Sequence, residues 1–220
     1  QGLIAKYEFN NGNCDDSLGK YNGRNNGAAF AGGHLSVSGG SSCEIDSLRN
    51  HVWGHGFSAC TWFKRTGGAG YQGILSTGYF HHGAWEIRSG PDGKGNIFVG
   101  GTPQLEAVTR ASGWWFGAGK DAQGNSKLLF MNRGAWNHVC MTWNGDIGRF
   151  YLNGKLAESS HDAGKPADET GGRGPMKTTG EPVFIGKAGT GHAGENFIGQ
   201  IDDVRLYNRA VNAADVAELY

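Results

Sequence analysis

The sequence lacks an excess of either charge, an apolar run long enough to span a membrane and a paired-cysteine motif. Its 220 residues include 20 Lys and Arg and 20 Asp and Glu, so the formal net charge at pH 7 is zero. A balanced charge gives no reason to expect a nucleic acid as partner. No stretch approaches the roughly 18 apolar residues of a transmembrane helix, so we expect no membrane insertion.

The four cysteines are far apart and form no C-x-x-C pair, which leaves no zinc-binding cysteine pattern. They are Cys14, Cys43, Cys60 and Cys140. An even number of scattered cysteines indicates two disulfides in an oxidising compartment, with four reduced buried thiols as the alternative. The chain begins QGLIAKYEF, without an initiator Met or a signal peptide. If this is a natural mature start, a targeting segment has been removed and the protein is secreted.

Glycine is abundant, with 40 residues, but it follows no fixed period, so neither a collagen repeat nor low-complexity disorder is indicated. The glycines lie between short aromatic and β-branched segments, as turn residues do between β-strands. The pattern predicts one all-β domain over residues 1–220, an antiparallel two-sheet sandwich. The Gly- and charge-rich segment 159–181 is an excursion from it, because strand patterns resume afterwards. Expected strands cover residues 3–9, 57–65, 73–77, 84–88, 96–100, 126–131, 136–144, 149–154, 182–186 and 197–208.

One helix is expected, in the C-terminal segment VNAADVAELY. Asn212 suits the N-cap, and Asp215 falls at the third helical position, near the positive end of the helix dipole. Val211 and Val216 occupy the two positions of a hydrophobic staple. A short terminal helix of this kind is expected to cover a sheet face or edge.

The stretch WNHVCMTWNG, residues 136–145, resembles the pentraxin signature, in which His, Cys, Ser or Thr and Trp alternate along one strand. Four residues match it, while Gly145 replaces the usual Ser or Thr. The matching residues are His138, Cys140, Thr142 and Trp143. The segment 57–65 looks like the family strand that carries the partner cysteine. The opening loop and residues 197–220 resemble those of laminin-G-like, concanavalin-A-type jelly rolls.

This resemblance implies a jelly-roll fold with a short C-terminal helix. It also implies a disulfide between Cys60 and Cys140, and so a second between Cys14 and Cys43. Pentraxins form rings, so the resemblance implies a homo-oligomer, although the sequence specifies no subunit contact.

The resemblance further implies a structural calcium ion. Laminin-G-like jelly rolls often hold one between the N-terminal loop and an Asp of the closing strand, which here implies Asp16, Asn22 and Asp202 as ligands. Calcium takes carboxylate and amide oxygens of this kind. The alternative is that these acids cap turns or pair with arginines. A pentraxin-type calcium cluster is not expected, because residues 155–175 lack the dense run of acids and amides that it needs.

A complete glucanase motif is also missing. Glucanases of this jelly-roll class use a Glu-x-Asp-x-x-Glu run on one strand, which supplies the nucleophile and the acid/base. The segment CEIDSLRN contains Glu44 and Asp46 but no third carboxylate. We therefore expect no activity of this type, and we read both acids as surface or turn residues. A lyase or hydrolase that uses His and Tyr remains a separate hypothesis.

Two loops carry the mixture of aromatic and polar residues that binds sugars. A pyranose packs its apolar face on an aromatic ring while polar groups contact its hydroxyls. The candidate contacts are Tyr79, His81, His82, Trp114 and Trp115, whereas four further tryptophans fit strand patterns and are assigned to the core: Trp62, Trp85, Trp136 and Trp143. The preferred hypothesis is a secreted carbohydrate-binding protein, a lectin or carbohydrate-binding module that takes a glycan or polysaccharide. The alternative is a protein-binding adhesive module.

Overall fold

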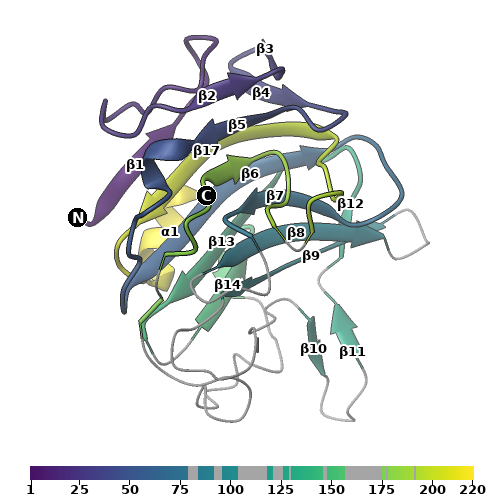
Figure 1. The fold of residues 1–220 in the computed structure, drawn as a ribbon. Coiled ribbons are helices and arrows are strands. Elements are labelled where there is room, and N and C mark those ends of the chain that lie inside the picture. The colour runs from purple at the N-terminus through teal and green to yellow at the C-terminus, as the bar shows by residue number, and fades with distance from the viewer. Residues whose placement is uncertain are drawn as a thin grey trace.

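Two antiparallel β-sheets pack face to face, and a short helix lies on the outer side of one of them (Figure 1). The computed structural model describes residues 1–78, 84–91, 96–103, 118–120, 126–128, 130–145, 148–156, 175–176, 178–190 and 192–220. This arrangement confirms the predicted all-β jelly-roll sandwich with a short helix at the C-terminal end.

The first sheet has eight strands in the order β15-β14-β13-β6-β17-β4-β3, with β1 paired to β17. Strand β6 lies at its centre, between β13 and β17. The strands are β1 (Leu3–Tyr7), β3 (Ala29–Ala31), β4 (His34–Val37), β6 (Phe57–Arg65), β13 (Asn137–Trp143), β14 (Gly148–Leu152), β15 (Lys155–Leu156) and β17 (Gly199–Tyr207).

The second sheet has seven strands in the order β12-β9-β8-β7-β16-β5-β2. They are β2 (Arg24–Asn26), β5 (Ser42–Ile45), β7 (Gln72–Ser76), β8 (Trp85–Pro91), β9 (Asn96–Pro103), β12 (Phe130–Asn132) and β16 (Val183–Ile185). A separate pair is formed by β10 (Ala118–Lys120) and β11 (Ser126–Leu128), and one 3-10 turn, η1, covers Asp46–Leu48. The strands that the sequence did not predict, among them β2 to β5, have two to four residues each, too few for a clear alternation.

Alternation along β6 and β13 builds the core between the sheets. Phe57, Ala59 and Phe63 of β6 belong to the main buried cluster, as do Val139 and Met141 of β13. The residues that alternate with them, such as Cys60 and Trp62, face the opposite side, because successive side chains of a strand point to opposite faces. The eight-stranded sheet therefore has an outer face that the second sheet does not cover.

Helix α1 (Ala213–Leu219) covers one part of that outer face. The Asn212 side chain accepts the backbone N–H groups of Ala214 and Asp215, and the Asp215 side chain accepts the N–H of Asn212, which confirms the predicted capping box. Val211 and Val216 are buried together, as a hydrophobic staple requires. They pack in a second small core that contains Cys60, Cys140, Tyr151 and Tyr207.

Both disulfides join the cysteines that the resemblance paired. Cys60 and Cys140 face each other directly across β6 and β13, with their Cα atoms 4.0 Å apart. Cys14 joins the N-terminal loop to Cys43 of β5, with a Cα separation of 5.9 Å. One bridge therefore lies under the helix, and the other holds the N-terminal loop to the second sheet.

The two disulfides are expected to differ in their contribution to stability. They span 80 and 29 residues of sequence. In the chain-entropy description, the longer loop restricts the unfolded chain more, by about 1 kcal/mol. Replacing Cys60 and Cys140 with Ala should therefore lower the free energy of unfolding more than replacing Cys14 and Cys43. Urea denaturation of the two double variants measures this, and the reverse order would contradict it.

Candidate functional site

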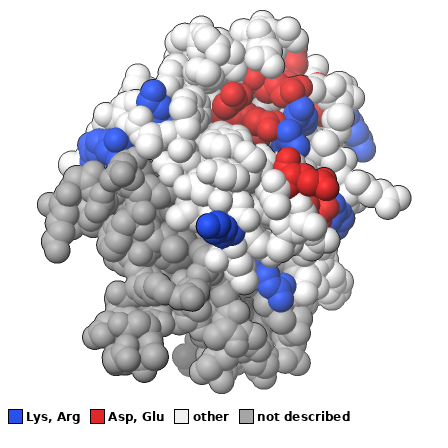
Figure 2. Space-filling view, turned by 180° about the vertical axis from the view of Figure 1, so that it is seen from behind, with Lys and Arg blue, Asp and Glu red and all other residues white. Residues whose placement is uncertain are grey.

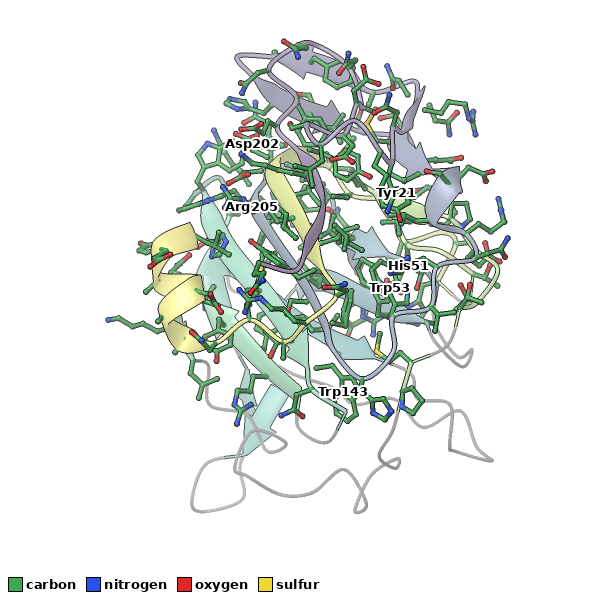
Figure 3. The ribbon with its side chains drawn as sticks, turned by 90° about the vertical axis from the view of Figure 1, so that its left-hand side faces the viewer. Tyr21, His51, Trp53, Trp143, Asp202 and Arg205 are labelled. Carbon is green, nitrogen blue, oxygen red and sulfur yellow. A yellow bond between two sulfur atoms is a disulfide. The ribbon has the colours of Figure 1, made fainter. Side chains whose placement is uncertain are left out.

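A shallow groove of about 470 Å³ lies on the outer face of the eight-stranded sheet. It is lined by two tryptophans, two carboxylates and one imidazole: His34, Trp62, Trp136, Asp202 and Asp203. In Figure 3, the labelled Asp202 lies on the helix side of the molecule, away from the labelled residues Tyr21, His51 and Trp53. The groove therefore lies on the same side of the molecule as helix α1 and outside the core.

The strand register brings these side chains together from distant parts of the sequence. Trp62 of β6 lies opposite His138 of β13 on one side and opposite Asp202 of β17 on the other. His34 begins β4, the next strand along, and its Nδ1 lies 3.6 Å from Asp202 Oδ2. Trp136 directly precedes β13 and meets the His34 ring edge-on at a centroid distance of 5.0 Å.

Four strand tryptophans were predicted to lie in the core, and the prediction is right for two of them and wrong for the other two. Trp85 and Trp143 are completely buried in the main cluster. Trp62 and Trp136 are only partly buried and lie outside both buried clusters. Successive side chains of a strand point to opposite faces. Trp62 lies an odd number of positions from Phe57 and Phe63, which point inward, so its side chain points outward.

Trp62 belongs to a row of rings on the outer face. Its ring stacks on Tyr220 with a centroid distance of 5.4 Å and an angle of 15°. The ring of His138 lies 5.3 Å from it at a tilt of 50°. Tyr220 is 59% exposed, so this row continues from the groove towards the C-terminal end of helix α1.

A β-bulge in β17 brings two carboxylates into the groove. The pairing of β17 with β6 shifts register between Asp202 and Arg205. Asp203 adopts a left-handed backbone conformation, with φ of 46°. A residue other than glycine in this conformation costs about 1 kcal/mol or more, and bulges are common beside functional sites because they redirect side chains. Here the bulge lets the consecutive Asp202 and Asp203 both line one groove.

The two carboxylates have different partners. Arg205 Nε and Nη2 donate to the two oxygens of Asp203 at 2.9 and 2.7 Å, so this charge is neutralised. Asp202 accepts the backbone N–H of Asp203 and faces His34. Burial raises the pKa of Asp202 above its ordinary value. Figure 2 shows this face, where acidic and basic side chains gather together beside a largely uncharged area.

The residues predicted as calcium ligands have separate surroundings. Asp16 is buried, and its carboxylate accepts the backbone N–H groups of Lys6, Leu18, Lys20 and Tyr21 at 2.8 to 3.1 Å. Asn22 Oδ1 accepts the N–H of Asp16 at 3.1 Å. These contacts hold the N-terminal loop in shape. Asp202 lines the groove, and neither of the other two does.

The predicted sugar contacts fall outside the described residues. Tyr79, His81 and His82 belong to the connection between β7 and β8, and Trp114 and Trp115 to the segment between β9 and β10. Their participation in a binding site stays a prediction.

A second polar cluster lies on the other sheet and was not predicted. Glu86 and Arg88 of β8 meet His192 and Glu195 of the connection between β16 and β17. Glu86, His192 and Glu195 place three potential metal-ligating atoms within 4.8 Å of one another. Glu86 could have been found from the strand pattern, since it lies between Trp85 and Ile87, which point into the core.

A sequence profile described as the concanavalin A-like lectin/glucanases superfamily, of laminin-G type, matches residues 37–217. The chain belongs to this superfamily. A pentraxin fusion protein from Xenopus laevis is 27% identical over 92 residues, which cover 39% of this chain and 20% of that protein. The chain thus matches about a fifth of this relative's length.

Several solved structures are similar in fold over almost the whole chain. Domain 4 of AbnA, an extracellular arabinanase of Geobacillus stearothermophilus in complex with arabinotriose, has a TM-score of 0.64 and 18% identity. The match covers 99% of this chain and 98% of that domain. A Trypanosoma rangeli sialidase mutant with trans-sialidase activity has a TM-score of 0.62 and 17% identity, covering 98% of this chain and 32% of that one.

The binding domain of Paraclostridial Mosquitocidal Protein 1 is also similar, with a TM-score of 0.63 and 17% identity. That match covers 99% of this chain and 51% of the other. At these identities the structures share a fold. The concanavalin A-like fold of this chain therefore recurs in carbohydrate-binding and glycoside hydrolase proteins. Among the described residues, no helix has the length and apolarity to cross a membrane.

Acidification should destabilise the protein through His138. Burial lowers the pKa of this imidazole to about 4, and its Nδ1 has no hydrogen-bond partner. The unfolded chain, with a histidine pKa of about 6.5, takes up the proton first as the pH falls. Stability should therefore decrease between about pH 6.5 and 4, by about 3 kcal/mol, since each pKa unit corresponds to about 1.4 kcal/mol.

Urea denaturation of the wild-type protein and His138→Gln, at about pH 7 and about pH 4.5, isolates this contribution. The wild-type protein should lose more stability on acidification than the variant. Equal losses would show that His138 does not resist protonation in the folded state.

Proposed function

We propose that this domain binds carbohydrate in the groove lined by Trp62, Trp136, Asp202 and Asp203. The observation that carries the proposal is the placement of two partly exposed indole rings beside two carboxylates. An indole ring packs against the apolar face of a pyranose, and carboxylates accept hydrogen bonds from its hydroxyl groups. The groove is open and shallow, as suits a sugar chain that lies along a protein surface.

The comparisons support this class of function. The similar AbnA domain was solved with arabinotriose, and another similar structure is that of a sialidase. Two disulfides fit the oxidising conditions met by secreted proteins. We therefore propose a secreted lectin or carbohydrate-binding module. The sugar contacts predicted at Tyr79, His81, His82, Trp114 and Trp115 are kept as a second proposed surface.

The charges of the groove favour neutral glycans. No Lys or Arg is among the described residues that line it. The neighbouring Arg205 is already paired with Asp203 through two hydrogen bonds. A sialic acid or uronic acid would bring its carboxylate close to Asp202, and the only basic side chain among the described lining residues is His34, which already faces Asp202. We therefore propose neutral oligosaccharides as the ligands.

Glycan-array binding followed by calorimetry tests this function. The wild-type protein should bind neutral glycans, and Trp62→Ala and Trp136→Ala should each weaken binding about tenfold or more, as expected for central aromatic contacts. Tyr71→Ala is the matched control, because Tyr71 is an exposed ring beside Arg88, outside the groove.

Three other results would contradict the proposal. Binding of a protein partner without competition by sugars would favour the adhesive module. Glycan binding that is unchanged in both groove variants would place the site elsewhere. Turnover of a polysaccharide would favour a lyase or hydrolase.

Calcium is a separate part of the proposal. The oxygens of Asp16 and Asn22 accept N–H groups of the loop itself. Asp16 also lines a hollow of about 440 Å³ in this loop. Glu8, Asn13 and Asp15 line the same hollow with further side-chain oxygen atoms. Carboxylates and amides are ligands that calcium takes, so we propose that these residues would hold it.

Thermal unfolding in calcium and in EDTA checks this expectation. The unfolding temperature should be higher in calcium, and Asp15→Asn should remove the difference because it takes away a carboxylate ligand. Asp16→Asn should lower the unfolding temperature in both solutions, since it weakens the loop itself. Identical unfolding temperatures in calcium and EDTA would contradict the calcium site.

A further inference from the structure

The cluster on β8 gathers two carboxylates, an imidazole and a guanidinium on the outer side of the seven-stranded sheet. His192 Nδ1 lies 2.7 Å from Glu86 Oε2 and 3.8 Å from Glu195 Oε2. Arg88 Nη1 donates to Glu195 Oε2 at 2.9 Å and lies 3.1 Å from His192 Nδ1. Trp85 and Ile87 point into the core, so Glu86 and Arg88, which alternate with them along β8, point to the outer side. Strand β8 belongs to the seven-stranded sheet, whereas the groove lies on the eight-stranded sheet.

The carboxylate of Glu86 is incompletely satisfied. Its side chain is 0% exposed, and its Oε1 has no hydrogen-bond partner. A buried carboxylate oxygen without a partner is costly, and such groups are commonly paired with a cation or a metal. The described side chains of the cluster include two carboxylates and one guanidinium, so they carry one more negative charge than positive charge when His192 is neutral.

The backbone around the cluster is fixed before any ligand arrives. Glu195 N–H donates to the carbonyl of His192 at 2.8 Å, and the Glu195 carbonyl accepts the N–H groups of Gly73 and Ala188. The first of these bonds closes a turn between the two residues. The bond from Gly73 holds that turn against β7, and the bond from Ala188 holds it against the segment that follows β16. Ligand side chains on such a framework lose little freedom on binding a metal.

We propose that Glu86, His192 and Glu195 form a binding site for a zinc-like divalent transition metal. Their ligand atoms lie within 4.8 Å of one another, close enough to converge on one ion after small side-chain rotations. The imidazole nitrogen favours zinc over calcium, which takes oxygen ligands. Three protein ligands leave a fourth position for water or a substrate atom.

Arg88 is the internal competitor for this metal. Its guanidinium carbon lies 4.4 Å from the centre of the Tyr71 ring. Its Nη1 contacts both Glu195 and His192, where the metal would also bind. A metal ion must displace this contact, while the Tyr71 ring continues to hold the rest of the guanidinium. Removing the guanidinium should therefore strengthen metal binding.

Zinc titration of the chelator-treated full chain, followed by competition with a chromophoric chelator, tests the proposal. The wild-type protein should bind one zinc ion. Glu86→Gln and His192→Gln should each weaken binding about tenfold or more, and Arg88→Gln should strengthen it. The unfolding temperature should rise with zinc in the wild-type protein and in Arg88→Gln, but not in Glu86→Gln. His55→Gln, at an exposed histidine outside both the cluster and the groove, is the matched control and should bind zinc like the wild-type protein.

Two results would overturn the site. Zinc binding that is unchanged in Glu86→Gln and His192→Gln would place the metal elsewhere. Binding by Arg88→Gln but not by the wild-type protein would show that the guanidinium is the permanent cation of the cluster. Because the titration uses zinc alone, its outcome is independent of whether the groove binds sugar.

Discussion

The structure depends on the strict alternation of side chains along the central strand β6. Its neighbours β13 and β17 are both held to it in register, so each residue of β6 must face either the second sheet or the outside. Phe57 and Phe63 fill the core. Cys60 and Trp62 are placed on the outer face by the same rule, the first under helix α1 and the second in the groove.

The two faces of the eight-stranded sheet therefore have different functions. The inner face supplies the apolar burial that stabilises the sandwich. The outer face is covered by the helix at one end and presents aromatic rings and carboxylates at the other. The bulge at Asp203 departs from the regular ladder, and it lies where the two carboxylates enter the groove. The departure from ideal geometry coincides with the candidate site, as is common for bulges.

Local patterns predicted the fold well and the site poorly. The capping box at Asn212 and Asp215 lies within four consecutive residues, so the sequence was sufficient to identify it. The disulfides followed from a family resemblance rather than from spacing. Hydrophobicity alone assigns Trp62 to the core, whereas its position next to the inward-facing Phe63 places it on the outer face. Glu86 and His192 lie 106 residues apart, and only the folded chain shows that they are neighbours.

The central claim is that Trp62 and Trp136 contact a bound sugar. Two-dimensional NMR of the tryptophan indole N–H groups, assigned with single variants, measures this directly during titration with a neutral oligosaccharide. The signals of Trp62 and Trp136 should move until the site is saturated, whereas those of the buried Trp85 and Trp143 should stay in place. Saturable binding that shifts only Trp114 or Trp115, or none of these signals, would contradict the claim.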